Sequence, residues 1–249
     1  MQVKIDQLTK AYGMPMFGQT IALDNVFLEF PGAELVAIVG ANGAGKTTLL
    51  ESLVGIVAST SGAVFLDGER FSRSRIDLRR RIAYLPDVPL FFANTTVLKH
   101  ISLYVACYEA DRVGLDAEIV NWLQEFALLP KIDHQVRTLS RGERYKAALI
   151  ALLAVNAELW LIDEPFASGM DPEGLLAFRK AARMAVERGV TVIYSTQILE
   201  VAERFSDRVC ILQSGRVRTF DSIERLRDQH GIHGGDLEAI YRRISETPQ

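Results

Sequence analysis

A glycine-rich stretch from Gly40 to Thr48 combines residue types that bind phosphate groups. It fits the pattern G-x-x-x-x-G-K-[ST], in which backbone N–H groups that no Cβ shields approach an anion at the start of a helix. In this pattern the Lys46 ammonium reaches the β- and γ-phosphates of a nucleotide, and the Thr47 hydroxyl ligates Mg²⁺. An ordinary glycine-rich turn is the alternative, but the apolar run 35–39 before the stretch and the helix-like segment 49–54 after it favour a phosphate loop. The residues expected to bind the nucleotide are Asn42, Gly43, Ala44, Gly45, Lys46, Thr47 and Thr48.

Two adjacent carboxylates, Asp163 and Glu164, follow the apolar run from Leu159 to Ile162. The carboxyl ends of parallel strands line the ligand crevice of an α/β sheet. Asp163 is therefore placed to hold Mg²⁺ through water, and Glu164 to accept a proton from an attacking water molecule. Acidic turn residues that merely end a strand are the alternative for an isolated pair of this kind.

The segment Leu139-Ser140-Arg141-Gly142-Glu143 lies upstream of these carboxylates. Ser140 and Glu143 have the spacing of a capping box, which predicts that a helix begins here. The free N–H groups at the start of such a helix can also meet a γ-phosphate. We interpret the segment as both a helix cap and a candidate phosphate contact.

The composition narrows the class of protein. The 249 residues suit one large α/β domain, or one domain with a small insert. The 28 basic and 31 acidic residues leave a net charge of −3, which disfavours a nucleic-acid partner. Cys107 and Cys210 are the only cysteines, each among apolar neighbours, as expected for a reduced cytosolic interior. The N-terminus has no signal-peptide core, and the longest apolar run, 147–155, is too short to span a bilayer, so we expect a chain that is soluble by itself.

The remaining pattern predicts elements that position these groups in an α/β chain. Two strands joined by a loop are expected within residues 1–30, and helical spacing between 95 and 129 predicts a small all-helical insert that closes near 139. A flexible linker is expected from His230 to Gly235. Further strands are expected at 35–39, 63–70, 81–85, 158–162, 190–195 and 208–212, and a hairpin is expected to extend the last of these to 217. Helices are expected at 142–155, 172–188, 198–205 and 237–244.

Together these motifs resemble the nucleotide-binding subunits of ABC transporters, whose signature is L-S-G-G-Q. The resemblance covers roughly residues 1–225. It implies an α/β fold: a P-loop NTPase (RecA-like) core with an N-terminal antiparallel β subdomain and an inserted helical subdomain at about 90–139. Residues 226–249 would form a short C-terminal tail with a linker and a helix.

The same resemblance assigns roles to single residues. It makes Asp163 the Mg²⁺ aspartate, Glu164 the catalytic base and Asp171 part of a D-loop, where Asp171 also caps the next helix. Tyr12 resembles the aromatic residue that stacks on adenine, a contact worth about 1–3 kcal/mol, although a loop residue packed on the sheet is an equal alternative. The residues expected to reach ATP held by a second copy are Ser140, Arg141, Gly142 and Glu143.

Two positions depart from the family pattern. Asp87 stands where the family usually has glutamine; its carboxylate can still ligate Mg²⁺, but it adds negative charge and cannot donate a hydrogen bond. Gln197 stands where histidine is usual; it can donate to the γ-phosphate, but it carries no charge. We expect slower or differently tuned hydrolysis, because charge-assisted donors are roughly twice as strong as neutral ones.

The resemblance implies an ATPase that uses ATP and Mg²⁺, pairs head to tail with a second ABC ATPase copy and drives a separate membrane permease from the cytoplasmic face of the membrane. The pattern from Pro165 to Pro172 looks most like the ATPases of ABC-2-type exporters. An alternative from another class is an ATP-gated protein that hydrolyses little and serves a task such as iron–sulfur cluster assembly. A nucleic-acid ATPase is a third class, which the absence of a basic stripe disfavours.

Overall fold

The computed structural model describes residues 1–14, 18–92, 94–231 and 236–246, and a six-stranded sheet organises it. The strand order is β10-β9-β3-β8-β7-β6, and every neighbouring pair is parallel except β10 with β9. These strands are β3 (Leu35–Val39), β6 (Ile82–Leu85), β7 (Leu159–Ile162), β8 (Thr191–Thr196), β9 (Arg208–Gln213) and β10 (Arg216–Asp221). The expected α/β core is confirmed.

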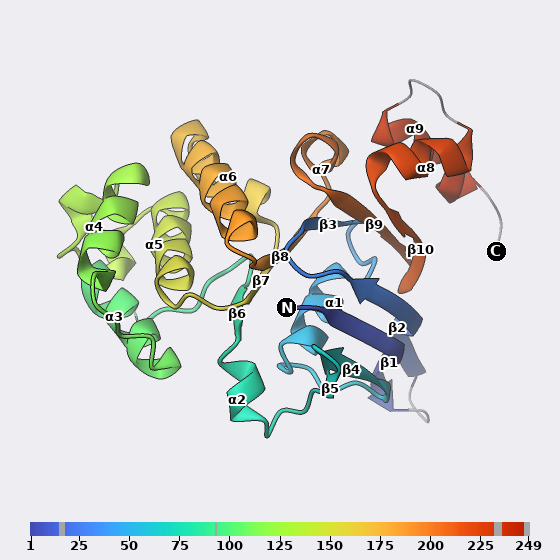
Figure 1. The fold of residues 1–249 in the computed structure, drawn as a ribbon, viewed down its shortest axis with the longest axis horizontal. Coiled ribbons are helices and arrows are strands. Elements are labelled where there is room, and N and C mark those ends of the chain that lie inside the picture. The colour runs from blue at the N-terminus through green and yellow to red at the C-terminus, as the bar shows by residue number, and fades with distance from the viewer. Residues whose placement is uncertain (15–17, 93, 232–235, 247–249) are drawn as a thin grey trace.

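Helices flank this sheet and extend beyond both of its ends. Figure 1 shows α3, α4 and α5 together at one end of the molecule, and α8 with α9 at the other. The helices are α1 (Lys46–Leu53), α2 (Ile76–Arg79), α3 (Val97–Tyr108), α4 (Leu115–Glu125), α5 (Arg141–Ala154), α6 (Pro172–Glu187), α7 (Leu199–Phe205), α8 (Ile223–His230) and α9 (Leu237–Glu246). Short 3-10 turns lie at Leu129–Lys131, Val136–Thr138 and Pro165–Ala167.

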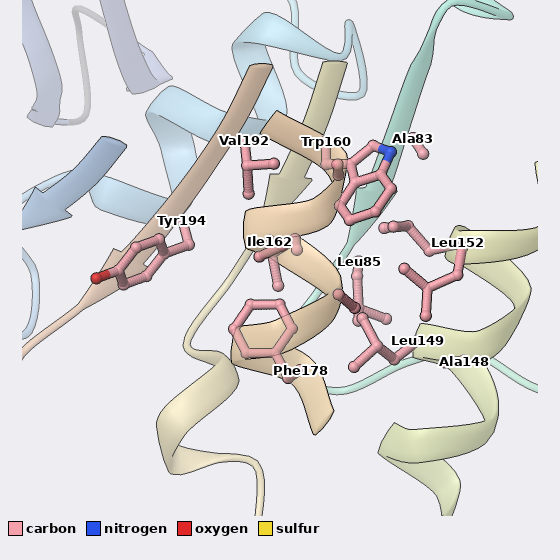
Figure 2. Packing of buried hydrophobic residues seen from close by; sticks show 14 of the residues in the cluster. Ala83, Leu85, Ala148, Leu149, Leu152, Trp160, Ile162, Phe178, Val192 and Tyr194 are labelled. Carbon is pink, nitrogen blue, oxygen red and sulfur yellow. The ribbon is translucent and has the colours of Figure 1, made fainter. Parts of the chain in front are cut away.

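The central strands are buried on both faces, so their sequences are continuous apolar runs without polar alternation. In β3, alternate residues belong to two separate apolar clusters, one on each side of the sheet. On one side, Trp160 and Ile162 of β7 lie near Leu149 of α5 and Phe178 of α6 (Figure 2). Two packed faces fix the sheet, and with it the strand ends that carry the candidate site.

The N-terminal residues form a second, antiparallel sheet with the order β2-β1-β4-β5. Its strands are β1 (Val3–Met14), β2 (Gly18–Phe30), β4 (Ser61–Leu66) and β5 (Glu69–Arg70). Leu49, Leu50 and Leu53 of α1 share one apolar cluster with residues of both sheets. The helix that follows the phosphate loop is therefore fixed by packing against both sheets.

The structure agrees with the expected helical insert but differs from the expected C-terminal segment. Helices α3 and α4 fall within 90–139, as expected. Helices α2 and α8 were not predicted, and α8 crosses the boundary placed at residue 225. The expected linker from His230 is wrong at its start, because His230 ends α8; residues 232–235 of that linker lie outside the described part of the chain.

The segment after β10 is tied to the core by apolar contacts. Leu226 of α8 and Leu237, Ile240 and Ile244 of α9 are buried in the larger apolar cluster. Among the residues that the structure describes, no helix combines the length and the apolar character needed to cross a bilayer.

Candidate functional site

The phosphate loop joins β3 to α1, and glycine sets its path. Gly45 has a φ of 105°, a left-handed conformation that favours glycine, and a Cβ there would lie 2.5 Å from the Ala22 carbonyl oxygen. A Cβ at Gly40 would lie 2.4 Å from the carbonyl oxygen of Leu212. These close approaches hold the loop against β2 and β9, while residues 41–43 stay exposed. The loop therefore presents an open face in front of the N-terminus of α1.

The Lys46 ammonium is buried within this loop. Its Nζ donates to the carbonyl oxygens of Gly40 at 2.8 Å and of Ala41 at 3.3 Å, and it lies 3.2 Å from Glu164 Oε1. The side chain of Lys46 is 6% exposed and that of Glu164 is 13% exposed. This ion pair joins the phosphate loop to the loop after β7, and phosphate oxygens can replace all three oxygen partners of the ammonium.

The Asp163 carboxylate is buried between two hydroxyl groups. Thr47 Oγ1 donates to Asp163 Oδ2 at 2.7 Å, and Ser195 Oγ donates to Asp163 Oδ1. The backbone of Asp163 is fixed as well, since its N–H donates to the Leu85 carbonyl at 2.8 Å and its carbonyl accepts from the Tyr145 hydroxyl at 3.3 Å. The side-chain oxygens of Thr47 and Asp163 thus converge on one point, as two oxygen ligands of Mg²⁺ must.

Negative charge accumulates around Asp163. Burial and the Asp163 carboxylate raise the pKa of Glu51 in α1. Burial, followed by the charges of Asp163, Glu51 and Asp87, raises the pKa of Tyr84. The Tyr84 hydroxyl is buried and has no hydrogen-bond partner among the described residues. A divalent cation would offset this concentration of carboxylates, so the residues present fit Mg²⁺.

Glu164 occupies a constrained position directly after Asp163. Its φ of 47° is left-handed, and its backbone N–H donates to Ser195 Oγ at 2.9 Å. Ser195 thus contacts both residues of the acidic pair, a role that the sequence analysis missed. The one signal in the sequence was its place at the end of the strand expected at 190–195. The structure then sets that strand, β8, beside β7.

The capping box at the start of α5 is present. The Ser140 hydroxyl accepts from the Glu143 N–H at 3.2 Å, and the Glu143 carboxylate accepts from the Ser140 N–H at 2.9 Å. Glu143 also pairs with Lys131, and this bond is the largest cause of its lowered pKa. Ser140 and Arg141 remain exposed. The beginning of α5 is therefore rigid but open to a partner.

The candidate D-loop, residues 168–171, packs closely against the same helix. A Cβ on Gly142 would lie 2.2 Å from the Gly169 carbonyl oxygen, so α5 and the D-loop touch backbone to backbone. Asp171 caps α6 by accepting from the Gly174 N–H at 2.8 Å, as predicted, and also accepts from Lys146 Nζ at 2.8 Å. The bond from Lys146 is the largest cause of the lowered pKa of Asp171.

The structure also describes Asp87 and Gln197, the two positions that depart from the family pattern. The Arg141 guanidinium donates to Asp87 Oδ1 at 3.0 Å, so these two predicted site residues form an ion pair within one chain. Gln197 is exposed and directly follows β8.

The structure places Tyr12 in a strand and leaves its ring exposed. Tyr12 lies in β1 opposite Thr20 of β2, and it is 41% exposed. Lys10 Nζ lies 4.7 Å from the centre of its ring. The alternative of a loop residue packed on the sheet is wrong, and stacking on adenine stays a prediction.

Comparison with known proteins identifies the family. A family profile described as ABC transporter matches residues 23–167, more than half of the chain. The chain belongs to this family, as an ABC transporter ATP-binding protein. The ABC-type transporter ATP-binding protein EcsA of Bacillus subtilis is 28% identical over 224 residues, which cover 90% of each chain. The Nod factor export ATP-binding protein I of Cupriavidus metallidurans is 29% identical over 94% of this chain and 78% of its own.

Solved structures agree with this assignment. The ATP-binding subunit of an ABC transporter superposes with a TM-score of 0.91 at 27% identity, over 99% of this chain and all of the other. A dimeric ATP-binding cassette in a post-hydrolysis state, bound to ADP and Pi, has a TM-score of 0.79 at 25% identity over 89% of this chain and 98% of its own. The fold and the family predicted from the sequence are confirmed.

We predict that Asp171→Asn lowers the free energy of unfolding at pH 7 by about 1–2 kcal/mol, between the values for exposed and buried ion pairs. Asparagine still caps a helix, so the substitution removes mainly the partner of Lys146, whose side chain is 5% exposed. The pKa of Asp171 is lowered in the folded protein, so its contribution is present above the ordinary aspartate value and is lost as the pH falls through the lowered one. Urea unfolding should show a constant difference from wild type above about pH 5 that shrinks below about pH 4.

The control is Glu173→Gln, which changes an exposed carboxylate in the same first turn of α6. This variant should stay within about 0.5 kcal/mol of wild type. Equal losses in the two variants would contradict the role given to the Lys146–Asp171 pair.

Proposed function

We propose that this chain binds ATP with Mg²⁺ and hydrolyses it to ADP and phosphate, as the energy-supplying subunit of a transporter. One observation carries the proposal: the contacts Lys46–Glu164 and Thr47–Asp163 bring the two halves of the predicted site together. The first half is the phosphate loop and the second is the acidic pair after β7. Because these two segments are far apart in the sequence, their convergence supports a shared chemical task.

The chemistry of each side chain predicts its role in the reaction. The phosphates would replace the oxygen partners of Lys46 and bind the free N–H groups at the start of α1. Thr47, Asp163 and Asp87 would hold Mg²⁺, which neutralises charge on the phosphates when it is bound. Glu164 would accept a proton from a water molecule whose oxygen attacks the γ-phosphorus. The bond between the γ-phosphorus and the bridging oxygen would break in the same step, and ADP would leave.

The Lys46–Glu164 ion pair adds a step to this scheme. Glu164 Oε1 lies 3.2 Å from Lys46 Nζ, so the proposed base is held by the proposed phosphate ligand. Bound phosphates would compete for Lys46 and release Glu164. Coupling of this kind would make the base available only when a nucleotide is present.

We propose that a second copy of the chain completes each site. Ser140 and Arg141 are exposed, and the start of α5 is fixed to its own D-loop through Gly142 and Gly169. In its own chain Arg141 pairs with Asp87 instead of the phosphate loop. The dimeric cassette among the similar structures supports the pairing of two copies. In such a pair, residues 140–143 of each copy would face ATP on the other. Tyr12 would stack on adenine, and Asp171 would hold the D-loop at this interface.

The partner in the membrane is proposed to be a separate permease. A groove of about 530 Å³ lies between Asp87 and the helical insert, where such a subunit could dock. The names of the relatives, which include a Nod factor export protein, support an exporter. The chain would then act at the cytoplasmic face of the cell membrane through its permease.

A second candidate function is an ATP-gated protein that hydrolyses ATP slowly or not at all and acts outside transport. Asp87 and Gln197 favour it, because neither can supply a positively charged donor to the γ-phosphate. Glu164 favours hydrolysis, because a carboxylate is present at the position of the base.

We predict that Glu164→Gln abolishes phosphate release while ATP binding is retained, because the amide cannot accept a proton at neutral pH. The variant should lose at least about a hundredfold in turnover, the lower range for removal of a general base. It should also accumulate as an ATP-bound dimer, which size-exclusion chromatography with light scattering would detect. Glu51→Gln is the matched control, since Glu51 is another carboxylate that the Asp163 charge affects, and Lys46 pairs with Glu164 instead.

Negligible turnover in both wild type and Glu164→Gln would favour the non-hydrolysing alternative. Undiminished turnover in Glu164→Gln would exclude Glu164 as the base.

We also predict that Gln197→His raises the turnover of ATP roughly tenfold, because a charged donor gains about 1–1.5 kcal/mol over a neutral one. The gain should appear in kcat and should fade as the pH rises through the pKa of the new imidazole. Gln197→Asn, which keeps the amide, is the control and should not gain. A histidine variant no faster than the asparagine variant would contradict the expectation that Gln197 slows hydrolysis.

A further inference from the structure

A pocket of about 540 Å³ lies where the end of α1 meets the antiparallel sheet, and no predicted site residue lines it. Its first wall is the turn 55–59, which follows α1. Its second wall runs from Arg70 of β5 to Arg75, the residue that precedes α2. A Cβ on Gly55 would lie 3.2 Å from Arg73 Cγ, so the two walls are in close contact. Figure 1 shows β5 and α2 near the lower edge of the molecule.

Positive charge is concentrated in the second wall. Arg70, Arg73 and Arg75 line the pocket, and none of its described lining residues is acidic. Arg75 is neutralised by Glu69 and Asp77, at 2.7 and 2.6 Å. Arg70 and Arg73 are exposed, and within the described part of the chain no carboxylate pairs with either. The pocket thus presents two guanidinium groups without a counter-charge, in a chain whose net charge is −3.

Hydroxyl and ammonium groups add hydrogen-bond donors around the same pocket. Ser59 and Ser72 line it, and both are exposed. Lys10 Nζ donates to the carbonyl oxygen of the lining residue Ala58 at 2.9 Å, which places a third cation at the edge of the pocket. Guanidinium, ammonium and hydroxyl donors together match the oxygens of a phosphate group.

Two exposed isoleucines lie beside this cationic pocket. Ile56 belongs to the first wall and is 51% exposed, and Ile76 directly follows Arg75 and is 58% exposed. Arg79, about one turn after Ile76 in α2, is also exposed, and no ion pair involves it among the residues that the structure describes. The surface therefore combines unpaired cations with apolar side chains.

We propose that this pocket binds the phosphate headgroup of an anionic phospholipid, with Ile56 and Ile76 inserted among the lipids beside it. The chain would then touch the membrane directly, in addition to any contact through a permease, so the proposal goes beyond the proposed function. A phospholipid offers phosphate and hydrocarbon at one surface, which matches arginines flanked by isoleucines.

Two other anionic partners fit this surface less well. A soluble phosphate compound would satisfy the arginines but would leave both isoleucines in water. A nucleic acid also binds cations, but its bases stack on aromatic rings, which isoleucine does not supply.

The lipid contact would orient the chain more than it would anchor it. A few basic residues and two small apolar side chains give weak, reversible binding to a bilayer. A permease would hold the pocket close to the membrane, where the high effective concentration makes such a weak contact sufficient.

Sedimentation with vesicles of defined composition tests the proposal. The purified chain is mixed with vesicles of phosphatidylcholine alone, or of phosphatidylcholine with phosphatidylglycerol, and the bound fraction is measured after ultracentrifugation. We expect binding to the anionic vesicles only. Arg70→Gln/Arg73→Gln should weaken this binding roughly tenfold or more, because each basic residue near an anionic surface strengthens binding severalfold.

The matched control is Arg188→Gln/Arg242→Gln, which removes two exposed arginines at the end of α6 and in α9. Its net charge equals that of the pocket variant. Binding to anionic vesicles should change less than about twofold, because charges far from the bilayer are screened.

A fluorescent probe tests the insertion of the isoleucines. Ile76→Cys, in a background with Cys107→Ser to remove the exposed native thiol, carries an environment-sensitive dye whose emission should shift to the blue with anionic vesicles. The same dye at Val113→Cys, which is fully exposed and outside the pocket, should not shift. Thermal melts establish that each variant is folded.

Absence of binding to anionic vesicles would overturn the proposal, as would equal weakening in the two double variants or a dye at position 76 that stays in water. Arginine-dependent binding of glycerol 3-phosphate without such binding to vesicles would overturn it in favour of a soluble phosphate compound. The same result with duplex DNA would overturn it in favour of a nucleic acid.

ATP hydrolysis and dimerisation are measured on the same proteins, and both should be unchanged by Arg70→Gln/Arg73→Gln. A chain that hydrolyses ATP but does not bind anionic vesicles refutes this inference alone. A chain that binds the vesicles through these arginines but neither binds nor hydrolyses ATP refutes the proposed function alone.

Discussion

Parallel pairing of β3, β8 and β7 is the constraint on which the candidate site depends. Val39 of β3 pairs with Thr196 of β8, and Ile162 of β7 pairs with Tyr194, so three adjacent strands end at one edge of the sheet. The phosphate loop, the acidic pair and Gln197 each follow one of these ends. Apolar clusters on both faces prevent the strands from slipping in register. The geometry of the site is thus a consequence of the core.

The same packing supports the proposal that two chains share each site. The start of α5 is anchored to the D-loop by the backbone contact of Gly142 with Gly169, and its first side chain pairs with Asp87. Ser140 stays exposed instead of reaching the chain's own phosphate loop. A rigid, capped helix end is suited to a partner that arrives from outside, since it needs no rearrangement before binding.

Features that depend only on short stretches of sequence could be predicted from the sequence alone. The glycine pattern predicted the phosphate loop, Ser140 and Glu143 predicted the cap of α5, and apolar runs predicted the buried strands. The missed features depend on tertiary contacts. Ser195 gains its role only because β8 lies beside β7, and α8 is polar along most of its length, so its few buried apolar positions gave no clear helical pattern. The Asp87–Arg141 pair joins residues 54 positions apart, which no local pattern relates.

The central claim is that each ATP site is shared between two copies, and complementation of two inactive variants tests it most directly. Lys46→Ala removes the phosphate ligand from one chain, and Ser140→Arg blocks the contact that the other chain offers. Each variant alone should release almost no phosphate. An equal mixture should regain about a quarter of the wild-type activity, because half of the dimers are mixed and each mixed dimer has one intact site of two. A mixture as inactive as its components, or full activity of Ser140→Arg alone, would contradict the account.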